Sequence, residues 1–267
     1  MSNRFGSMLL AAVVIGVFIV AVAGPAIAPH SPTAPVGVPY ALPGEFPPFG
    51  TDHLGRDVLS RVLAGARPVF ITSALAAVVG TGLGAVIGLG AAVLGARKRW
   101  QEGALLRPLD AIAALPPLLV LLLIQTAQPS RFGIIVAVAV AGAPLSARVI
   151  RAAAAPLVTR GHVETAVARG ENMSWILGRE LLPLVAGPVA ADLGLRFVMA
   201  VYLVTAAGFL GVSAGETDWG ILIAEALPGA ALQPAALAVP VALVAVVAVS
   251  VNLLADRALA KSRALIA

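Results

Sequence analysis

Long apolar runs, separated by short segments that carry the charged residues, make up most of this chain. Six runs are long enough for a helix to cross a bilayer, and they lie near residues 8–28, 69–95, 105–126, 132–150, 187–211 and 233–254. Backbone N–H and C=O groups in lipid must be paired within their own segment, so each run is expected to be a helix. The pattern therefore predicts an all-α polytopic membrane protein with about six transmembrane helices.

The composition also favours a membrane protein. Of the 267 residues, 60% are hydrophobic and 12% are charged, whereas a soluble domain carries roughly 25% charged residues. The net charge of +5 would suit a nucleic-acid-binding protein, but the positive residues are spread through short loops, which is the pattern of membrane topology. The absence of cysteine excludes disulfides and cysteine-ligated metals.

The distribution of Lys and Arg predicts the orientation of the spans. With the N-terminus inside, thirteen of the eighteen Lys and Arg residues fall on the cytoplasmic side, four fall outside, and Arg196 lies in a span. This excess favours cytoplasmic N- and C-termini. Ala26-Ile27-Ala28 resembles a signal-peptide cleavage site, but Pro29 disfavours cleavage and the run before it is long enough to span, so a retained helix is expected.

The runs predict four regions. These are an N-terminal transmembrane helix at 1–28, a proline-rich extracytoplasmic connector with a GTDHLGRD segment at 29–68, a transmembrane core at 69–256 with a cytoplasmic loop at 155–185, and a cytoplasmic tail at 257–267. Within the core, the apolar piece 221–227 is too short to cross and is expected to be re-entrant or interfacial. Gly80, Gly84 and Gly88 leave one face of the second span bare, so another helix is expected to pack closely there.

The GTDHLGRD segment has features of a phosphate-binding loop, of a metal site and of a structural turn. Its glycines have the spacing of a phosphate-binding loop, but it lacks the Lys-Ser/Thr pair that holds phosphate and magnesium, and no strand precedes it. Asp52, His53 and Asp57 are a candidate metal site. In the alternative, Asp52 caps a helix that starts near Leu54, and Asp57 pairs with Arg61 four residues later. The alternative is favoured, so no resident metal is expected.

Neither catalysis nor ion coupling has strong support. The chain lacks an H-E-x-x-H motif and its three histidines lie in predicted loops, so an enzyme is not expected. An ion-coupled carrier would bury acids within its spans, and the candidates are Asp110 and Asp192. Because Asp192 and Arg196 are four residues apart on one helix face, they are expected to form a structural ion pair inside the bundle.

The charged segment between the fourth and fifth spans is unusual in so apolar a chain. Residues 163–167 follow helical spacing, Gly170 ends the helix, and Asn172 can start another. The second helix carries a large apolar set: Trp175, Ile176, Leu177, Leu181 and Leu182. An ordinary solvated loop would not need this set, and the predicted helix–turn–helix suits insertion into a groove on a soluble partner.

This segment is similar to the EAA loop of bacterial ABC importer permeases. The similarity lies in Glu164-Thr165-Ala166, in a glycine after three further residues, and in the closing Leu-Pro pair. In that family the loop forms the helix that docks on the ATPase subunit. The resemblance implies that these residues couple the chain to an ATPase: Glu164, Ala166, Gly170, Trp175, Leu182 and Pro183.

A second stretch narrows the family. FGTDHLGRDVLSRVLAGAR, residues 49–67, is similar to the GTDxLGRDxxSRxxxGxR signature of the dipeptide, oligopeptide and nickel permease subfamily, the C-type subunit. The signature residues are Gly50, Thr51, Asp52, Gly55, Arg56 and Asp57. Shorter landmarks follow in family order, including Leu115-Pro116-Pro117 and Trp219-Gly220, so the resemblance covers nearly the whole chain after residue 45.

The resemblance implies a type I ABC importer permease fold in a bacterial inner membrane. The implied partners are a second homologous permease subunit, two ATP-binding subunits that hold ATP and magnesium, and an extracytoplasmic solute-binding protein. The chain itself would lie in membrane lipid, hold no cofactor and bind no nucleic acid. Di- or oligopeptides are the first expected cargo. Nickel or a metal chelate is one alternative, and an ion-coupled secondary transporter is the other.

Overall fold

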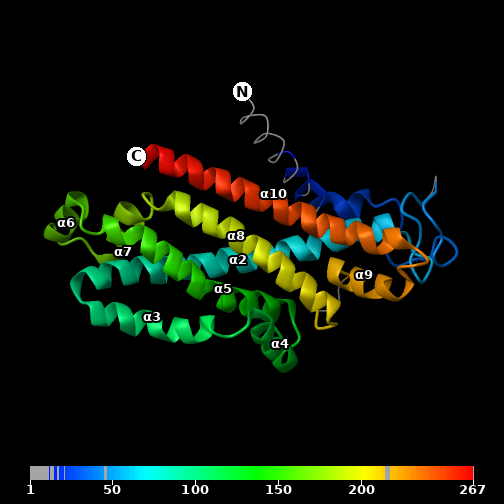
Figure 1. The fold of residues 1–267 in the computed structure, drawn as a ribbon, viewed down its shortest axis with the longest axis horizontal. Helices are drawn as coiled ribbons and strands as arrows, with labels where there is room; N and C mark the ends of the chain where they lie inside the picture. Colours follow the sequence, from blue (N-terminus) through cyan, green and yellow to red (C-terminus); the bar gives the residue numbers. More distant parts are fainter. Residues whose placement is uncertain are drawn as a thin grey trace. The chain divides into compact units, whose positions relative to one another are not determined.

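The computed structural model describes residues 12, 15–16, 18–20, 22–44, 47–213 and 217–266. Its helices are α2 (Val58–Arg97), α3 (Arg99–Ala113), α4 (Pro117–Ala127), α5 (Arg131–Ala154), α6 (Gly161–Ala168), α7 (Met173–Trp175), α8 (Ala186–Phe209), α9 (Trp219–Ala226) and α10 (Pro234–Ile266). Short turns of 3₁₀-helix, η1 (Ala155–Leu157) and η3 (Leu227–Gly229), and a π-helix, η2 (Ile176–Leu181), lie between them. The all-α prediction is confirmed (Figure 1).

Among the described residues, four helices are long and apolar enough to cross a membrane, and they coincide with four of the predicted spans. They are Val58–Ala96, Arg131–Leu157, Ala186–Phe209 and Pro234–Arg257. Part of the predicted first span, 8–28, lies outside the described residues; within it, residues 12, 15–16, 18–20 and 22–27 are described and helical. α2 begins at Val58 rather than near residue 69. Its first part accommodates Arg61, because that side chain is neutralised in ion pairs, and Pro68 also lies within the helix.

The predicted third span, 105–126, is not one straight helix. It is divided between α3 and α4, with a bend of 82° between them. The Pro116-Pro117 pair accounts for the break, because proline lacks an N–H group and disfavours helical backbone in the residue before it. α4 then starts on Pro117, at the helix position where a missing N–H group costs nothing.

The internal contacts divide the residues into two compact units. The first contains Met1–Leu75, Leu121–Ile135 and Val198–Leu254, and the second contains Ala76–Val120, Val136–Phe197 and Ala255–Ala267. Five helices, α2, α4, α5, α8 and α10, contribute residues to both units. The functional residues predicted from the sequence therefore fall into two separate groups.

In the second unit, α2 and α5 pack with their backbones close together. A Cβ atom at Gly88 would lie 2.5 Å from the carbonyl oxygen of Ala147 and 3.0 Å from the amide nitrogen of Arg151. A Cβ atom at Gly80 would lie 3.2 Å from the Cα atom of Ala139. The bare face predicted from the glycine spacing is confirmed as a helix-packing face.

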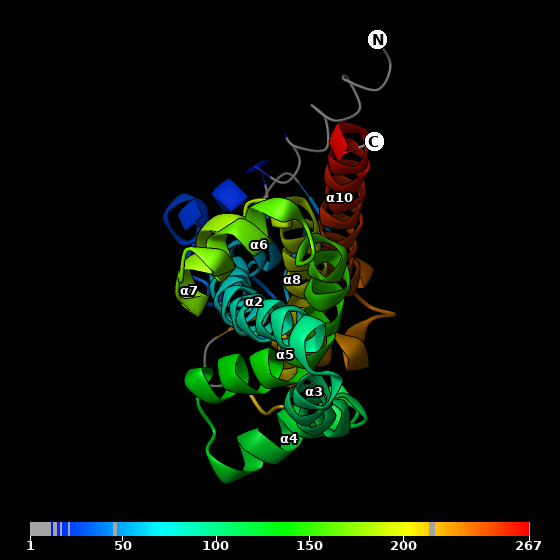
Figure 2. The ribbon, with the colours of Figure 1, turned by 90° about the vertical axis from the view of Figure 1, so that its left-hand side faces the viewer.

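α3 lies beside α5 in both views (Figures 1 and 2), and two ion pairs join these helices. Arg148 Nη2 is 2.6 Å from Asp110 Oδ1, and Arg151 pairs with Glu102. Both side chains of the first pair are about half exposed, at 51% and 47%. Asp110 is therefore an exposed ion-pair partner and lacks the burial that a proton carrier within a span requires.

In the first unit, α9 packs on the N-terminal part of α2. The fully buried Trp219 donates its indole N–H to the carbonyl oxygen of Val62 at 2.9 Å, and its ring meets Phe70 edge-on with 5.7 Å between centroids. The amide of Gln233 donates to the carbonyl oxygen of Phe49 at 2.6 Å. The short apolar piece predicted at 221–227 is thus a helix tied to α2 and to the connector.

The glycine face generates a matched pair of substitutions. Gly88→Ala should lower the melting temperature of the detergent-solubilised protein, because its Cβ atom would collide with the backbone of α5; the expected cost is about 1–3 kcal/mol. Gly90→Ala is the control: its Cβ atom meets nothing within 4 Å, and alanine favours the helix by about 0.5–1 kcal/mol. Equal melting temperatures for the two variants would contradict the packing.

Candidate functional site

The predicted helix–turn–helix, called here the α6–η2 segment (residues 161–185), lies in the second unit. Its first helix, α6, buries Val163 and Ala166 on one side. Glu164 and Thr165 are exposed on the other side, and Val167 is exposed at the edge of the buried face, four residues after Val163. This division follows from the helical repeat, because residues three apart share a face while the residues between them point away.

Gly170 ends α6 in a Schellman motif. Its φ angle of +77° lies in the left-handed region that favours glycine. The amide of Glu171 donates to the carbonyl oxygen of Ala166 at 3.2 Å, and the amide of Gly170 donates to that of Val167 at 3.0 Å. These are the two hydrogen bonds that define the motif. The predicted helix-breaking role of Gly170 therefore has a specific geometric cause.

The second helix of the segment starts at a side-chain cap and continues as a π-helix. The Asn172 side-chain oxygen accepts the amide of Trp175 at 2.9 Å, which satisfies a helix-terminal donor. From Ile176 the helix widens to η2, and the amide of Leu182 donates to the carbonyl oxygen of Leu177 at 2.9 Å. A π-helical turn of this kind is rare, and such turns often occur at functional sites.

A buried cluster fixes the segment to the second-unit parts of α2 and α5. It contains Ala85, Leu89, Ala92 and Val93 of α2, Ile150 and Ala154 of α5, Val158, and from the segment Val163, Ala166, Ile176, Leu181 and Val185. A force on the exposed side of the segment is thus applied to two long helices through packed side chains.

The structure separates the predicted coupling residues into two sets. Glu164, Gly170, Leu182 and Pro183 are exposed. Ala166 is fully buried, so it holds α6 in place and has no surface to offer a partner. Trp175 is half-buried against the cluster and beneath the guanidinium of Arg169, 5.5 Å from the ring centroid.

The apolar set predicted for a partner's groove therefore needs correction. Ile176 is 2% exposed, and Leu177 packs against the same cluster. These side chains satisfy the chain's own core. The exposed large apolar side chains of the segment are instead Val167, Met173, Leu182 and Leu184.

The signature residues of GTDHLGRD lie together in the first unit and shape the connector. Gly50 and Gly55 have φ angles of +70° and +76°. A Cβ atom at Gly55 would collide with the carbonyl oxygen of Gly37. The buried Thr51 hydroxyl donates to the carbonyl oxygen of Val38 at 2.6 Å and accepts the amide of Ala41 at 2.8 Å. The glycines permit the turn and the threonine fixes it.

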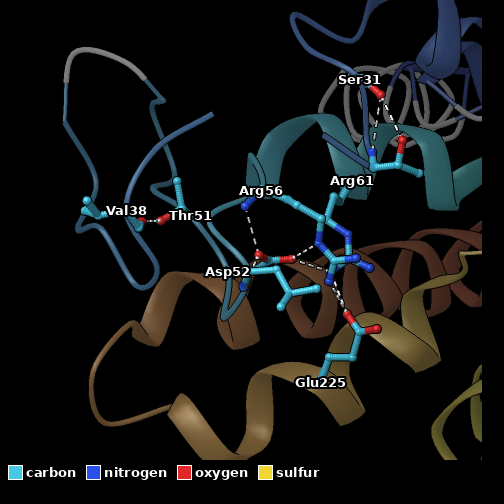
Figure 3. Close-up of polar contacts among 9 residues, drawn as sticks. Ser31, Val38, Thr51, Asp52, Arg56, Arg61 and Glu225 are labelled. Carbon is cyan, nitrogen blue, oxygen red and sulfur yellow. Dashed lines mark hydrogen bonds and ion pairs between the residues drawn. The ribbon is translucent and has the colours of Figure 1, made fainter. Parts of the chain in front are cut away.

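Asp52 is the centre of a charged cluster, called here the clasp, that contains Asp52, Arg56, Arg61 and Glu225 (Figure 3). Oδ2 of Asp52 lies 2.7 Å from Nε of Arg56 and 2.6 Å from Nη1 of Arg61. The same Nη1 lies 2.6 Å from Oε2 of Glu225 in α9, which also binds Arg56 at 3.0 Å. The clasp joins the connector, α2 and α9 with two positive and two negative charges.

Burial works to raise the pKa of Asp52, but its partners outweigh this effect. The backbone amides of Arg56 and Leu54 donate to its carboxylate, and the Arg56 and Arg61 guanidinium groups add favourable charge, so the pKa falls below its usual 3.8. A depressed folded-state pKa contributes stability above the unfolded value, and this stability is lost as the pH falls through the folded value.

Asp57, not Asp52, caps the helix. Its carboxylate accepts the amides of Leu59 and Ser60 at the start of α2 and lies 3.1 Å from Nδ1 of His30. The predicted Asp57–Arg61 pair is therefore wrong, because Arg61 turns to Asp52 and Glu225. The four-residue spacing is compatible with a pair between Asp57 and Arg61. The competing acid, Glu225, is 164 positions from Arg61 in sequence, so helical spacing gives no sign of it.

The ligand atoms of Asp52, His53 and Glu225 lie within 4.8 Å of one another. This set differs from the predicted metal candidates, since Glu225 replaces Asp57. Both carboxylates already bind guanidinium groups, so a cation would have to displace the positive charges of Arg56 and Arg61. The donor set fits a self-neutralised clasp better than a metal site.

Asp218 caps α9 and is a second acid of the first unit whose pKa is shifted. Its carboxylate accepts the amide of Ile221 at 2.9 Å. Burial raises its pKa to about 6, although the amides of Ile221 and Gly220 and the Ser213 side chain oppose the rise.

Residues 211–215 have the sequence pattern of the hydrolase turn G-x-S-x-G. In a hydrolase this pattern follows a strand, whereas here it follows helix α8 in the sequence.

The Asp192 and Arg196 side chains meet in the second unit. Nε of Arg196 lies 3.3 Å from Oδ1 of Asp192, and the other oxygen of Asp192 accepts the hydroxyl of Ser146 at 2.5 Å. Asp192 is 2% exposed at its side chain and Arg196 is 11% exposed. Both oxygens of the acid thus have a partner, as a buried carboxylate requires.

A family model described as "Binding-protein-dependent transport system inner membrane component" matches residues 84–262 of the chain. This range takes in the whole α6–η2 segment. The chain is also similar to the MetNI methionine ABC transporter, solved in inward-facing conformations, with a TM-score of 0.53 and 19% identity over 74% of this chain and 96% of that one. This likeness concerns the fold.

Three curated sequences illustrate the relatives. A putative peptide transport system permease protein of Brucella suis biovar 1 is 33% identical over 228 residues, covering 84% of this chain and 74% of the relative. The dipeptide transport system permease protein DppC of Bacillus subtilis is 29% identical, with coverage of 81% and 68%. The glutathione transport system permease protein GsiD of Pectobacterium atrosepticum is 28% identical, with coverage of 78% and 69%.

The clasp predicts a large effect for one arginine. Arg61→Met leaves the buried Asp52 and its neighbour Glu225 short of positive charge, and should destabilise the protein by about 3 kcal/mol. Thermal unfolding in detergent and protease cleavage within residues 29–57 would measure this loss. Arg67→Met, at an exposed position of the same helix, should change stability by less than about 0.5 kcal/mol. Indistinguishable unfolding of the two variants would argue against the clasp.

Proposed function

The chain belongs to the family of binding-protein-dependent transport system inner membrane components, and on that basis we propose that it is the membrane-spanning permease subunit of an ATP-driven bacterial importer of di- and oligopeptides. The family match across residues 84–262 carries the proposal. The peptide cargo is supported by relatives that are named as peptide and dipeptide permeases.

The energy source lies in partner subunits. The chain contains no G-x-x-x-x-G-K-[ST] loop of its own. The proposed assembly contains a second homologous permease subunit, two ATP-binding subunits that hold ATP and magnesium, and an extracytoplasmic solute-binding protein. Both termini and the α6–η2 segment face the cytoplasm, in keeping with the excess of Lys and Arg in the loops on that side.

The α6–η2 segment supplies the mechanical link. Its exposed side presents Glu164, Val167 and Leu182 to the ATP-binding subunit, while its buried side is packed against α2 and α5. Closure of the ATPase pair then moves the segment together with these helices. The permease alternates between inward- and outward-open states, and the difference in ATPase binding between the states sets the direction of transport.

Reconstitution tests the function. The full chain, co-expressed with the second permease subunit, the ATP-binding subunits and the solute-binding protein of its own organism, should accumulate labelled dialanine in proteoliposomes. Uptake should require both ATP and the solute-binding protein. Accumulation by this chain alone, driven by an ion gradient, would identify a secondary carrier and reject the proposal; nickel uptake without dialanine uptake would reject the peptide cargo.

Gly170 provides a test of coupling. Space around it is open, with nothing within 4 Å of a built Cβ atom, so only its φ angle of +77° restricts the side chain. Gly170→Val should distort the Schellman motif and reduce uptake per ATP hydrolysed by about tenfold, because a β-branched residue is strained in the left-handed region.

Two variants control for this change. Gly170→Asn should retain most uptake, since asparagine tolerates the left-handed region. Gly178→Ala, at an exposed glycine of η2 with open space and no positive φ, should behave as the wild type. Normal uptake by Gly170→Val at equal expression would show that this turn does not transmit the motion.

A further inference from the structure

Arg196 occupies the middle of a membrane span. It is ten residues from the start of α8 and thirteen from its end, so at about 1.5 Å per residue it lies roughly 15–20 Å from either end. A guanidinium at this depth cannot reach the interface by extending its side chain. Its environment within the membrane must therefore supply hydrogen-bond acceptors.

Within the chain, Arg196 has a partner for only part of its guanidinium. Nε donates to Asp192 at 3.3 Å, and Ser146 occupies the second oxygen of that carboxylate. In the described part of the chain, the two Nη groups have no hydrogen-bond acceptor. The side chain is nevertheless 11% exposed, so the Nη groups face the surroundings of the chain.

The surroundings cannot be lipid tails. Unsatisfied N–H donors in hydrocarbon cost several kcal/mol each, and intramembrane arginines face a bundle interior or a water-filled path. The Arg196 stem runs past Gly142 of α5, where an added Cβ atom would lie 3.5 Å from Arg196 Cδ, an ordinary contact distance. The ion pair with Asp192 anchors one edge of the guanidinium, and the outer edge is available to bind.

We propose that the Nη edge of Arg196 lines the transport path and binds the C-terminal carboxylate of the peptide in transit. The inference rests on the proposed peptide-import function and assigns a substrate contact within it. A guanidinium presents paired N–H donors that match the two oxygens of a carboxylate. Asp192 keeps the net charge of the site near zero when it is empty, so the carboxylate is held transiently and released.

The test compares a peptide with and without its carboxylate. Uptake of labelled dialanine and of dialanine amide is measured in proteoliposomes that hold the full transporter. Arg196→Gln combined with Asp192→Asn removes the arginine without leaving a buried acid unpaired. We expect this double variant to raise the KM for the free acid about tenfold, the scale of one lost charge-assisted hydrogen-bonded contact, and to leave the KM for the amide unchanged.

The controls separate this contact from other effects. The same solute-binding protein serves wild type and variant, so its own preference for acid or amide cancels when the two are compared. Arg67→Gln, at an exposed position outside the second unit, should leave both KM values unchanged. An equal change for acid and amide, or no change for either, would overturn the assignment.

A wild-type measurement keeps the proposal testable if the double variant does not fold. Phenylglyoxal modifies arginines that water reaches, and mass spectrometry locates the product. Arg196 should be modified, with protection by dialanine and not by dialanine amide. An unmodified Arg196 would assign the Nη edge to a protein contact. The same conclusion would follow if the double variant lost the second permease subunit while its acid-to-amide KM ratio stayed unchanged. Absence of all dialanine uptake by the wild type would instead reject the proposed function.

Discussion

Two sets of buried acids and arginines, one in each unit, pair within the described part of the chain, and this pairing organises both units. In the first unit, Asp52 gathers Arg56 and Arg61, and Glu225 completes the set from a helix more than 160 positions away in sequence. In the second unit, Asp192 is saturated by Arg196 and a serine hydroxyl. Removal of one partner from such a set costs far more than its formation contributes, because the remaining charge stays buried.

The clasp is better understood as a device for specificity than as a source of net stability. The free-energy cost of removing four charges from water offsets most of the free energy gained from their attraction. A misplaced connector or α9 would, however, leave Asp52 or Arg61 unpaired, so the alternative arrangements are penalised heavily. The positive φ angles of Gly50 and Gly55 serve the same end, since they bring the connector back over α2 in the one path that completes the ion pairs.

Local patterns in the sequence predicted the elements well and their partners poorly. Apolar length located four spans, and glycine spacing identified the face of α2 that packs on α5, because both signals are local. The Pro116-Pro117 pair indicates a helix break, but the apolar run extends across it, so hydropathy alone predicts one continuous span. The Asp57–Arg61 pair failed for the opposite reason: helical spacing permitted it, while the competing partner Glu225 lies in a distant helix that no periodicity connects to Arg61.

The α6–η2 segment shows why a sequence motif does not separate contact from support. Ala166 and Glu164 belong to one tripeptide, yet one is fully buried and the other exposed, because adjacent residues of a helix point in different directions. An exposed glutamate transmits force only if its helix cannot slide, and Ala166, Ile176 and Leu181 prevent that by packing on two long helices. In the proposed substrate contact, the ion pair with Asp192 would have the same part for Arg196, because it anchors one edge of the guanidinium while the other edge binds. In both places the buried half of the motif determines what the exposed half is able to do.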